Sequence, residues 1–323
     1  ELFRNERPLF EEKWESLKVF VQYGMLSDEK FYERAVKFDL LTDLDGKYFT
    51  LEEYRTLTES EQTDKDGELV WLYTNDKEGQ YSAIERAREK GYSVLVLDGP
   101  LDIHAISQLE QKLEKTRFVR VDSDSIAKLI VKDEAKESHL SAEEQKTLSE
   151  IFKARLPKDE KRNYSVVFEA LGAEADAVLI TQGEFMRRMQ EMARLQPGMN
   201  FYGDLPEGYN VVLNTDHALL SRLLSSEKSE IEPKLQSLRT ELAEQTKLVE
   251  DARSAQSAKK PEEVTATERE ELSALAAKQA EIEGKINAEL RAFGDREPLV
   301  GQLVDLALLG SGLLTGEALA AFI

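Results

Sequence analysis

The sequence predicts a mixed fold: a small three-layer αβα domain of the α/β class, followed by an α+β domain that carries an inserted helical coiled-coil hairpin. Apolar segments of strand length alternate with helical segments between residues 68 and 121, which is typical of a parallel sheet covered on both faces. Two long runs of leucine-spaced residues between about 227 and 292 predict the coiled coil. We therefore expect two domains, residues 1–131 and 141–323, joined by a polar linker.

Composition excludes several classes of partner and site. The 323 residues suffice for two domains of roughly 100–200 residues each. A net charge of −20 disfavours binding to nucleic acid or to an anionic membrane, because both need a basic surface. The chain has no cysteine, which excludes disulfides, thiolate nucleophiles and zinc-thiolate sites, so a reducing cytoplasm is the expected location. Because the chain begins with Glu1, we expect it to be a fragment of a longer protein.

The first domain is expected to begin with helices and to continue with the alternating segments. Apolar residues at helical spacing fill residues 9–35, and Thr50 with Glu53 forms a capping box that starts the next helix. The remaining expected elements are strands at 68–74, 92–97 and 117–121, and helices at 81–90 and 101–113.

Two acidic residues beyond the second of these strands raise the alternative of an enzyme. Ligands of open α/β sheets bind beyond the carboxyl ends of the strands, where Asp98 and Asp102 stand. They could bind a hard metal ion, but both also suit a turn and a helix start, and the segment has only Gly99 where a phosphate loop needs several glycines. We therefore expect a structural role, no catalytic residue and no metal site. His104, in the first turn of the next helix, is expected to be an ordinary surface histidine.

The second domain is expected to begin with a helix at 142–156. Strands at 164–170 and 177–181 are separated by a short turn, which predicts a β-hairpin. A third strand at 209–213 leads to a helix at 217–224, which Asn214 or Thr215 is expected to cap.

Methionines gather in one predicted helix, residues 183–195. Phe185, Met189 and Met192 share a face, with Met186 beside them. Unbranched, polarizable methionine side chains adapt to many shapes, so such clusters recur at promiscuous binding surfaces. Ordinary core packing is the alternative that spacing alone favours.

The coiled-coil hairpin contains two runs separated at Lys259-Lys260-Pro261. Thr267 and Glu270 are expected to form a capping box at the start of the second run. The seam is diluted by alanine, which predicts a projecting arm rather than a core.

The last segment, residues 299–323, is apolar on more than one helical face and carries only Asp305 and Glu317 as charges. The Gly310-Ser311-Gly312 break predicts two helices, the second capped by Thr315, and leaves each run short of the ~20 residues that span a bilayer. Pairing with the same hairpin of a second copy would cover this surface, since a two-fold axis places one patch on its twin; packing onto its own domain is the alternative. The expected homodimer contacts are Leu299, Val300, Leu303, Leu306, Leu309, Leu313, Leu319 and Phe322.

Four motifs give the chain a resemblance to the bacterial members of the heat-shock protein 90 chaperone family, and they span nearly its whole length. Each is similar to a family segment in order and spacing. They are the helix 14–24 with Asp45-Gly46 and Leu51–Tyr54, the strand Gly91–Asp98 with Leu101-Asp102, the junction Asn214–His217 with Leu219, and the helix segment Leu303–Leu309.

The resemblance implies that residues up to about 131 are the later part of the family's middle domain, and that the rest is its C-terminal dimerisation domain. It implies client-protein contacts on two helices, with His104 standing where well-studied relatives have an aromatic residue. ATP and Mg²⁺ would bind in an N-terminal domain outside this chain, so this chain alone would not hydrolyse ATP. The family pattern lacks residues 226–291. The implied client-contact residues are Phe185, Met186, Met189 and Met192 on the later helix, and Ile103, His104 and Ser107 on the earlier one.

The sequence thus favours a chaperone fragment that dimerises and binds partly folded clients. Two other classes stay open: a structural coiled-coil tether whose α/β domains are spacers, and a phosphoryl-transfer or metal enzyme that uses Asp98 and Asp102.

Overall fold

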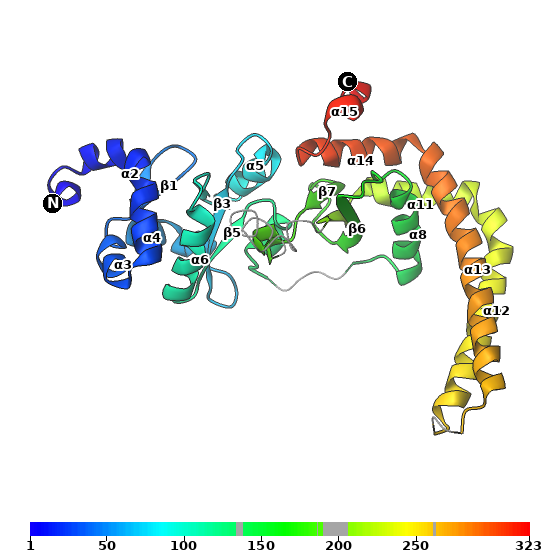
Figure 1. The fold of residues 1–323 in the computed structure, drawn as a ribbon. Coiled ribbons are helices and arrows are strands. Elements are labelled where there is room, and N and C mark those ends of the chain that lie inside the picture. Colours follow the sequence, from blue (N-terminus) through cyan, green and yellow to red (C-terminus); the bar gives the residue numbers. More distant parts are fainter. Residues whose placement is uncertain (134–137, 186, 190–205, 261–262) are drawn as a thin grey trace.

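The computed structural model describes residues 1–133, 138–185, 187–189, 206–260 and 263–323. Two mixed α/β bodies lie side by side, and a long helical hairpin projects from the second (Figure 1). We refer to residues 1–131 as the first region and to residues 141–323 as the second region.

The first region is built on a parallel three-stranded sheet with the order β4-β3-β5. Successive residues of β3 point to opposite faces. Trp71 packs with Tyr54 and Ile106 on one face, while Val70 packs with Ile84 on the other. The sheet is therefore covered on both faces, as the continuous apolar strands predict. Its strands are β3 (Leu69–Thr74), β4 (Val94–Val96) and β5 (Thr116–Arg120), and the helices that follow them are α5 (Tyr81–Glu89), α6 (Asp102–Lys112) and α7 (Ile126–Leu129).

The helices before this sheet also agree with the sequence. The predicted capping box is present, because Thr50 Oγ1 accepts from Glu53 N and the Glu53 side chain accepts from Thr50 N. Gly91, with φ of 75°, follows the end of α5. The early elements are α1 (Leu2–Asn5), α2 (Arg7–Ser27), α3 (Glu29–Ala35), β1 (Leu40–Thr42), β2 (Tyr48–Thr50) and α4 (Leu51–Gln62).

The second region contains a three-stranded sheet whose order, β6-β8-β7, contradicts the predicted hairpin. Strand β8 (Glu207–Asn214) lies between β6 (Arg162–Glu169), with which it is parallel, and β7 (Val178–Thr181), with which it is antiparallel. Because β8 lies between β6 and β7, the turn after β6 cannot close a hairpin, and the side chain of Asn214, the last residue of β8, contacts this loop. This side chain accepts from Leu171 N at 3.1 Å and donates to Gly172 O at 2.8 Å, so it holds the loop across the end of β8.

Asn214 is therefore committed to this loop, and the expected helix cap was wrong. Helix α11 (Ala218–Glu230) is capped instead by His217, whose Nδ1 accepts from Leu219 N at 3.2 Å. Helix α8 (Ala142–Lys153) precedes the sheet and begins with a capping box of Ser141 and Glu144.

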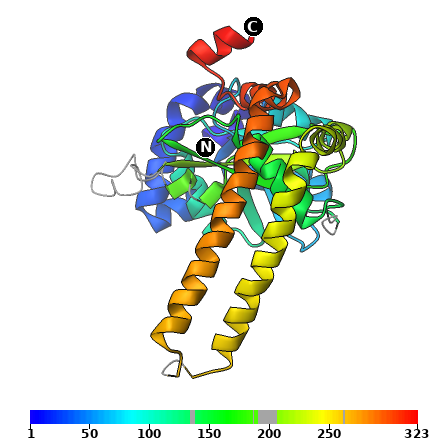
Figure 2. The same cartoon turned by 90° about the vertical axis from the view of Figure 1, so that its right-hand side faces the viewer.

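The inserted hairpin consists of α12 (Glu232–Ser257) and α13 (Ala266–Arg296), which run side by side in opposite directions (Figure 2). Its capping box uses Thr265 and Glu268, two residues earlier than predicted. The arm projects, but its base belongs to the core of the second region, contrary to the expectation of an arm without core. The core residues that the hairpin contributes are Leu235, Ile282, Ile286, Leu290 and Phe293, with Ile231 just before α12.

The chain ends in α14 (Pro298–Gly310) and α15 (Gly316–Phe322), separated by the predicted glycine break. Gly312 has φ of 67°, and a Cβ there would stand 3.2 Å from Gly79 Cα in the first region. Thr315 occupies the N-cap position of α15, but its side chain makes no cap hydrogen bond.

Candidate functional site

The methionine-rich segment begins at the joint between the two regions. Residues 184, 185 and 187–189 are helical. The Phe185 side chain is 74% exposed, while Met189 is half-buried. Met186 and Met192 lie outside the described residues. The start of this helix therefore presents one large aromatic side chain to solvent.

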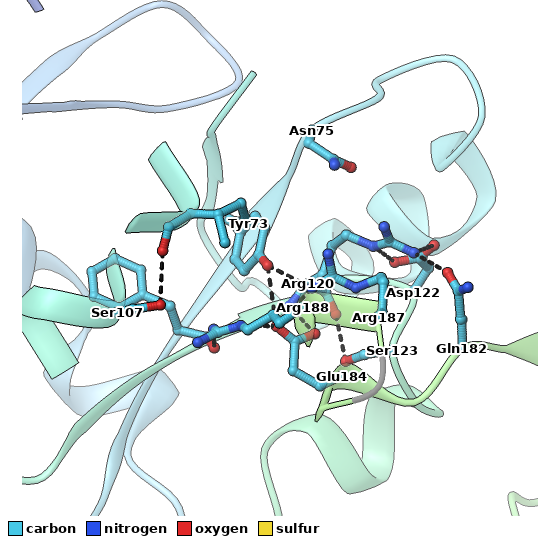
Figure 3. A network of polar contacts seen from close by, with 12 residues as sticks. Tyr73, Asn75, Ser107, Arg120, Asp122, Ser123, Gln182, Glu184, Arg187 and Arg188 are labelled. Atoms are coloured by element: carbon cyan, nitrogen blue, oxygen red, sulfur yellow. Dashed lines mark hydrogen bonds and ion pairs between the residues drawn. The ribbon is translucent and has the colours of Figure 1, made fainter. Parts of the chain in front are cut away.

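Glu184 connects this helix to the first region (Figure 3). Its Oε1 accepts from the Tyr73 hydroxyl at 3.1 Å and from Arg187 Nη2 at 2.7 Å. Its Oε2 accepts from the backbone N of Arg120 at 3.3 Å. Arg187 also donates to the Tyr73 hydroxyl at 2.6 Å. One carboxylate thus receives donors from strands β3 and β5 and from its own helix.

Arg188 extends the network to α6. Its Nη1 donates to Glu110 Oε2 at 2.7 Å, and its Nε donates to Glu184 Oε1 at 2.5 Å. Glu110 also accepts from Phe118 N on β5 at 2.6 Å. The helix start is therefore fastened both to the sheet and to the helix that covers it.

Arg120 and Asp122 form a further ion pair in the same joint. Arg120 donates to Asp122 Oδ2 and to Gln182 Oε1, both at 2.9 Å, and the backbone N of Gln182 donates to Asp122 O at 3.2 Å. Arg120 is 8% exposed and Arg187 is 3% exposed. Buried guanidinium groups need paired carboxylates, which Asp122, Glu184 and Glu110 supply.

Electrostatics in the joint favour the ionised carboxylate. Burial would raise the pKa of Glu184, but Arg187 and Arg188 outweigh it and hold the pKa below its usual range. Burial raises the pKa of the Tyr73 hydroxyl to about 12, so it stays a donor at neutral pH.

The earlier helix, α6, places its three predicted client-contact residues differently. Ile103 is 9% exposed and belongs to the core of the first region, so it offers little surface to a client. His104 and Ser107 are half-buried, and Ser107 Oγ donates to Ile103 O at 2.8 Å. The Arg188–Glu110 pair brings this helix and the Phe185 helix together, although they are 78 residues apart in sequence at that pair.

The spacing of Phe185 and the methionines selects residues 183–195, but it does not indicate the charged residues that hold the helix. Glu184 with Arg187 and Arg188 has the spacing of ion pairs one helical turn apart, which was a readable signal. The partners on β3, β5 and α6 come from distant positions, and only the fold reveals them.

The expected dimer contacts divide into covered and uncovered side chains. Val300 and Leu303 are 0% and 7% exposed because they pack into the core of their own region. Leu306 and Leu309 are 54% and 41% exposed on the other side of α14. The remaining expected residues, Leu299, Leu313, Leu319 and Phe322, are half-buried against the same core.

The helix α14 thus packs on its own subunit by one face and leaves a second apolar face uncovered. Among the residues described, no helix is both long enough and apolar enough to cross a membrane.

The two aspartates of the enzyme alternative do not converge. Asp102 is fully buried and accepts from Lys18 Nζ at 2.8 Å, from Gln22 Nε2 at 2.6 Å and from Gly99 N at 2.8 Å, whereas Asp98 is exposed. Asp102 therefore ties α2 to the start of α6. Within the described ranges, no group of three or more histidine or acidic side chains is arranged to hold a metal ion.

Comparison with known proteins shows which proteins this chain is related to, which the geometry alone does not show. No protein-family model matches the chain. The chain is 59% identical, over 327 aligned residues, to the chaperone protein HtpG of Porphyromonas gingivalis. All of this chain is covered by that match. This chain is a homologue of HtpG along all of its own 323 residues.

Further HtpG chaperones give the same result. That of Bacteroides fragilis is 47% identical and that of Bacteroides thetaiotaomicron is 45% identical, each over 322 residues and the whole of this chain. The chain spans 47% of the length of these HtpG relatives. The family resemblance drawn from the motifs is therefore confirmed. Since the relatives align across residues 227–292 as well, the inserted arm does not set this chain apart from them.

Proposed function

We propose that this chain is the dimerising and client-binding part of an HtpG-type molecular chaperone. The observation that carries the proposal is the match to HtpG chaperones along the entire chain. In the longer protein, ATP and Mg²⁺ would bind outside these 323 residues, and this chain would supply self-association and contact with partly folded proteins.

The proposed client surface is centred on Phe185. A solvent-exposed aromatic side chain on an anchored helix can bury apolar area against an unfolded segment without selecting a particular sequence. Met189 lies one turn further along the helix, and His104 and Ser107 lie on the neighbouring α6. Ile103 is not proposed as a contact, because the core already covers it.

The proposed homodimer would use the uncovered face of the end helices. Leu306 and Leu309 expose apolar area on α14, and Ile323 is 96% exposed at the end of the chain. A two-fold axis would cover both copies of this face at once. Dimerisation would hold two client surfaces at a high effective concentration relative to each other.

Suppression of aggregation tests the client part of the proposal. The whole chain should slow the thermal aggregation of a reporter enzyme such as citrate synthase, and the Phe185→Ser/Met189→Ser variant should lose most of this effect while keeping its melting temperature. Leu248→Ser is the matched control, because Leu248 is a 51% exposed leucine on the arm. Undiminished suppression by the double variant, or a collapse of its stability, would contradict the proposed client surface.

A further inference from the structure

We propose that Glu184 is a positioning residue: it ties the start of the Phe185 helix to the sheet of the first region and thereby fixes the direction in which Phe185 meets a client. This inference rests on the proposed function, and it adds a way in which the joint would control client affinity.

The position of Glu184 in the chain and in the fold supports this role. It immediately precedes Phe185, and its two oxygens accept from both regions: the Tyr73 hydroxyl and the Arg120 backbone on one side, Arg187 and Arg188 on the other. Because one carboxylate carries contacts to two strands, a change at Glu184 would weaken the attachment of the first helical turn to the sheet, while Arg187 would keep its contact with Tyr73 and Arg188 its contact with Glu110.

The balance of charges makes this contact specific. Among the described residues, the joint pairs three arginines with three carboxylates: Arg120 with Asp122, Arg187 with Glu184, and Arg188 with both Glu184 and Glu110. A glutamine at 184 would keep the size of the side chain, but it would replace the carboxylate that pairs with Arg187 and Arg188 by a neutral amide, and it would present an NH₂ group to guanidinium donors. Such a joint is expected to loosen locally.

Glu184 itself is poorly placed to contact a client. Its side chain is 23% exposed and its oxygens are already engaged, whereas Phe185 is 74% exposed. An effect of Glu184 on client affinity would therefore have to pass through the placement of its neighbour.

A thermodynamic cycle on the full chain tests this dependence. Binding of fluorescein-labelled, reduced and carboxymethylated α-lactalbumin, a permanently unfolded protein, is measured by fluorescence anisotropy for the parent chain, Glu184→Gln, Phe185→Ser and the double variant. Each single change is expected to weaken binding roughly fivefold, and the double variant should bind no more weakly than Phe185→Ser. Glu281→Gln is the matched control, since Glu281 pairs with Lys285 at 2.7 Å on the exposed arm, and it should leave affinity unchanged.

The outcomes separate the inference from the function. Effects that multiply in the double variant, or affinity of Glu184→Gln within about twofold of the parent, would overturn the positioning role while leaving the client surface intact. Unchanged affinity in Phe185→Ser would contradict the client surface itself. Hydrogen exchange should rise in residues 116–122 and 184–189 of Glu184→Gln and not in β8; a rise throughout the chain would show a general loss of structure and count against the inference. If Glu184→Gln does not fold, Glu184→Asp, which keeps the charge but shortens the tether, enters the same cycle with the same expectations.

Discussion

The joint around Glu184 and the helices at the carboxyl end differ in what holds them. The joint buries arginines and carboxylates that satisfy one another, and it leaves one aromatic side chain, Phe185, in solvent. Helix α14 packs by ordinary apolar contacts and leaves a second apolar face open at Leu306 and Leu309. Paired charges hold the joined elements in one orientation. An uncovered apolar face, in contrast, can be stabilised by burial against any apolar partner of matching shape. The comparison suggests that positioning and association are separate properties of this chain.

The largest expected effect is at the end helices. Leu306→Glu/Leu309→Glu should raise the dissociation constant of the proposed dimer more than about a hundredfold, because charges would be buried without partners in the interface. The melting temperature of the monomer should hardly change, since both side chains are exposed within the subunit. Sedimentation equilibrium over a concentration series measures the shift.

Leu248→Glu is the control for this experiment, because it places the same charge on an exposed leucine of the arm. A dimer that survives the double change at Leu306 and Leu309 but is lost with Leu248→Glu would move the interface to the coiled coil and favour the tether alternative.

The next effect distinguishes buried from exposed ion pairs in the joint. Arg187→Met removes a 3% exposed guanidinium and leaves Glu184 and Tyr73 without it, so the free energy of unfolding should fall by roughly 3–5 kcal/mol. Arg86→Met removes a pair with Asp176 that also joins the two regions, at 2.8 Å, and whose side chains are 31% and 54% exposed; this loss should cost only about 0–1 kcal/mol. Urea titration compares them, and equal losses would mean that burial in the joint adds nothing.

The smallest effect concerns Asp39, a buried carboxylate whose pKa is raised. Asp39 is 4% exposed; burial raises its pKa to about 7, with Lys18 opposing and Asp102 reinforcing the shift. A raised folded-state pKa means that the native state holds this proton more tightly than the unfolded state, so stability rises as pH falls through 7. The gain between about pH 8 and pH 6 should be about 1 kcal/mol, and Asp39→Asn should abolish it.

Glu184 should behave in the opposite way. Its pKa is lowered, so its contribution is present above the ordinary glutamate range and is lost only in acid. The predicted difference between the two carboxylates would be wrong if the free energy of unfolding fell on acidification from about pH 8 to pH 6 and Asp39→Asn left this pH dependence unchanged.

Much of the fold could be predicted from the sequence because local signals agreed with tertiary packing. A pattern of only a few residues predicts each of three features: the apolar strands of the first sheet, the Thr50–Glu53 capping box and the break at Gly310–Gly312. The order of the second sheet could not be predicted, because the short turn after β6 resembles a hairpin turn. The strand that separates β6 from β7, and the Asn214 side chain that contacts this turn, come some 40 residues later in the sequence.

The candidate site was predictable in part for the same reason. Spacing selected the helix with Phe185, but it gave no sign that Tyr73, Glu110 and Arg120 would meet its first turn, since those contacts join residues that lie far apart in the sequence. Burial also distinguished residues that periodicity treats alike: Val300 and Leu306 both fit an apolar helix face, yet one is covered and the other is not.

Sedimentation velocity of the chain with fluorescein-labelled unfolded α-lactalbumin tests most directly whether association and client contact are separate. The parent chain should sediment as a dimer that carries the label, Phe185→Ser should remain a dimer without the label, and Leu306→Glu/Leu309→Glu should sediment as a monomer that still carries some label. A parent chain that sediments as a monomer of 36.7 kDa at micromolar concentration, or a Phe185→Ser dimer that carries as much label as the parent, would contradict this account.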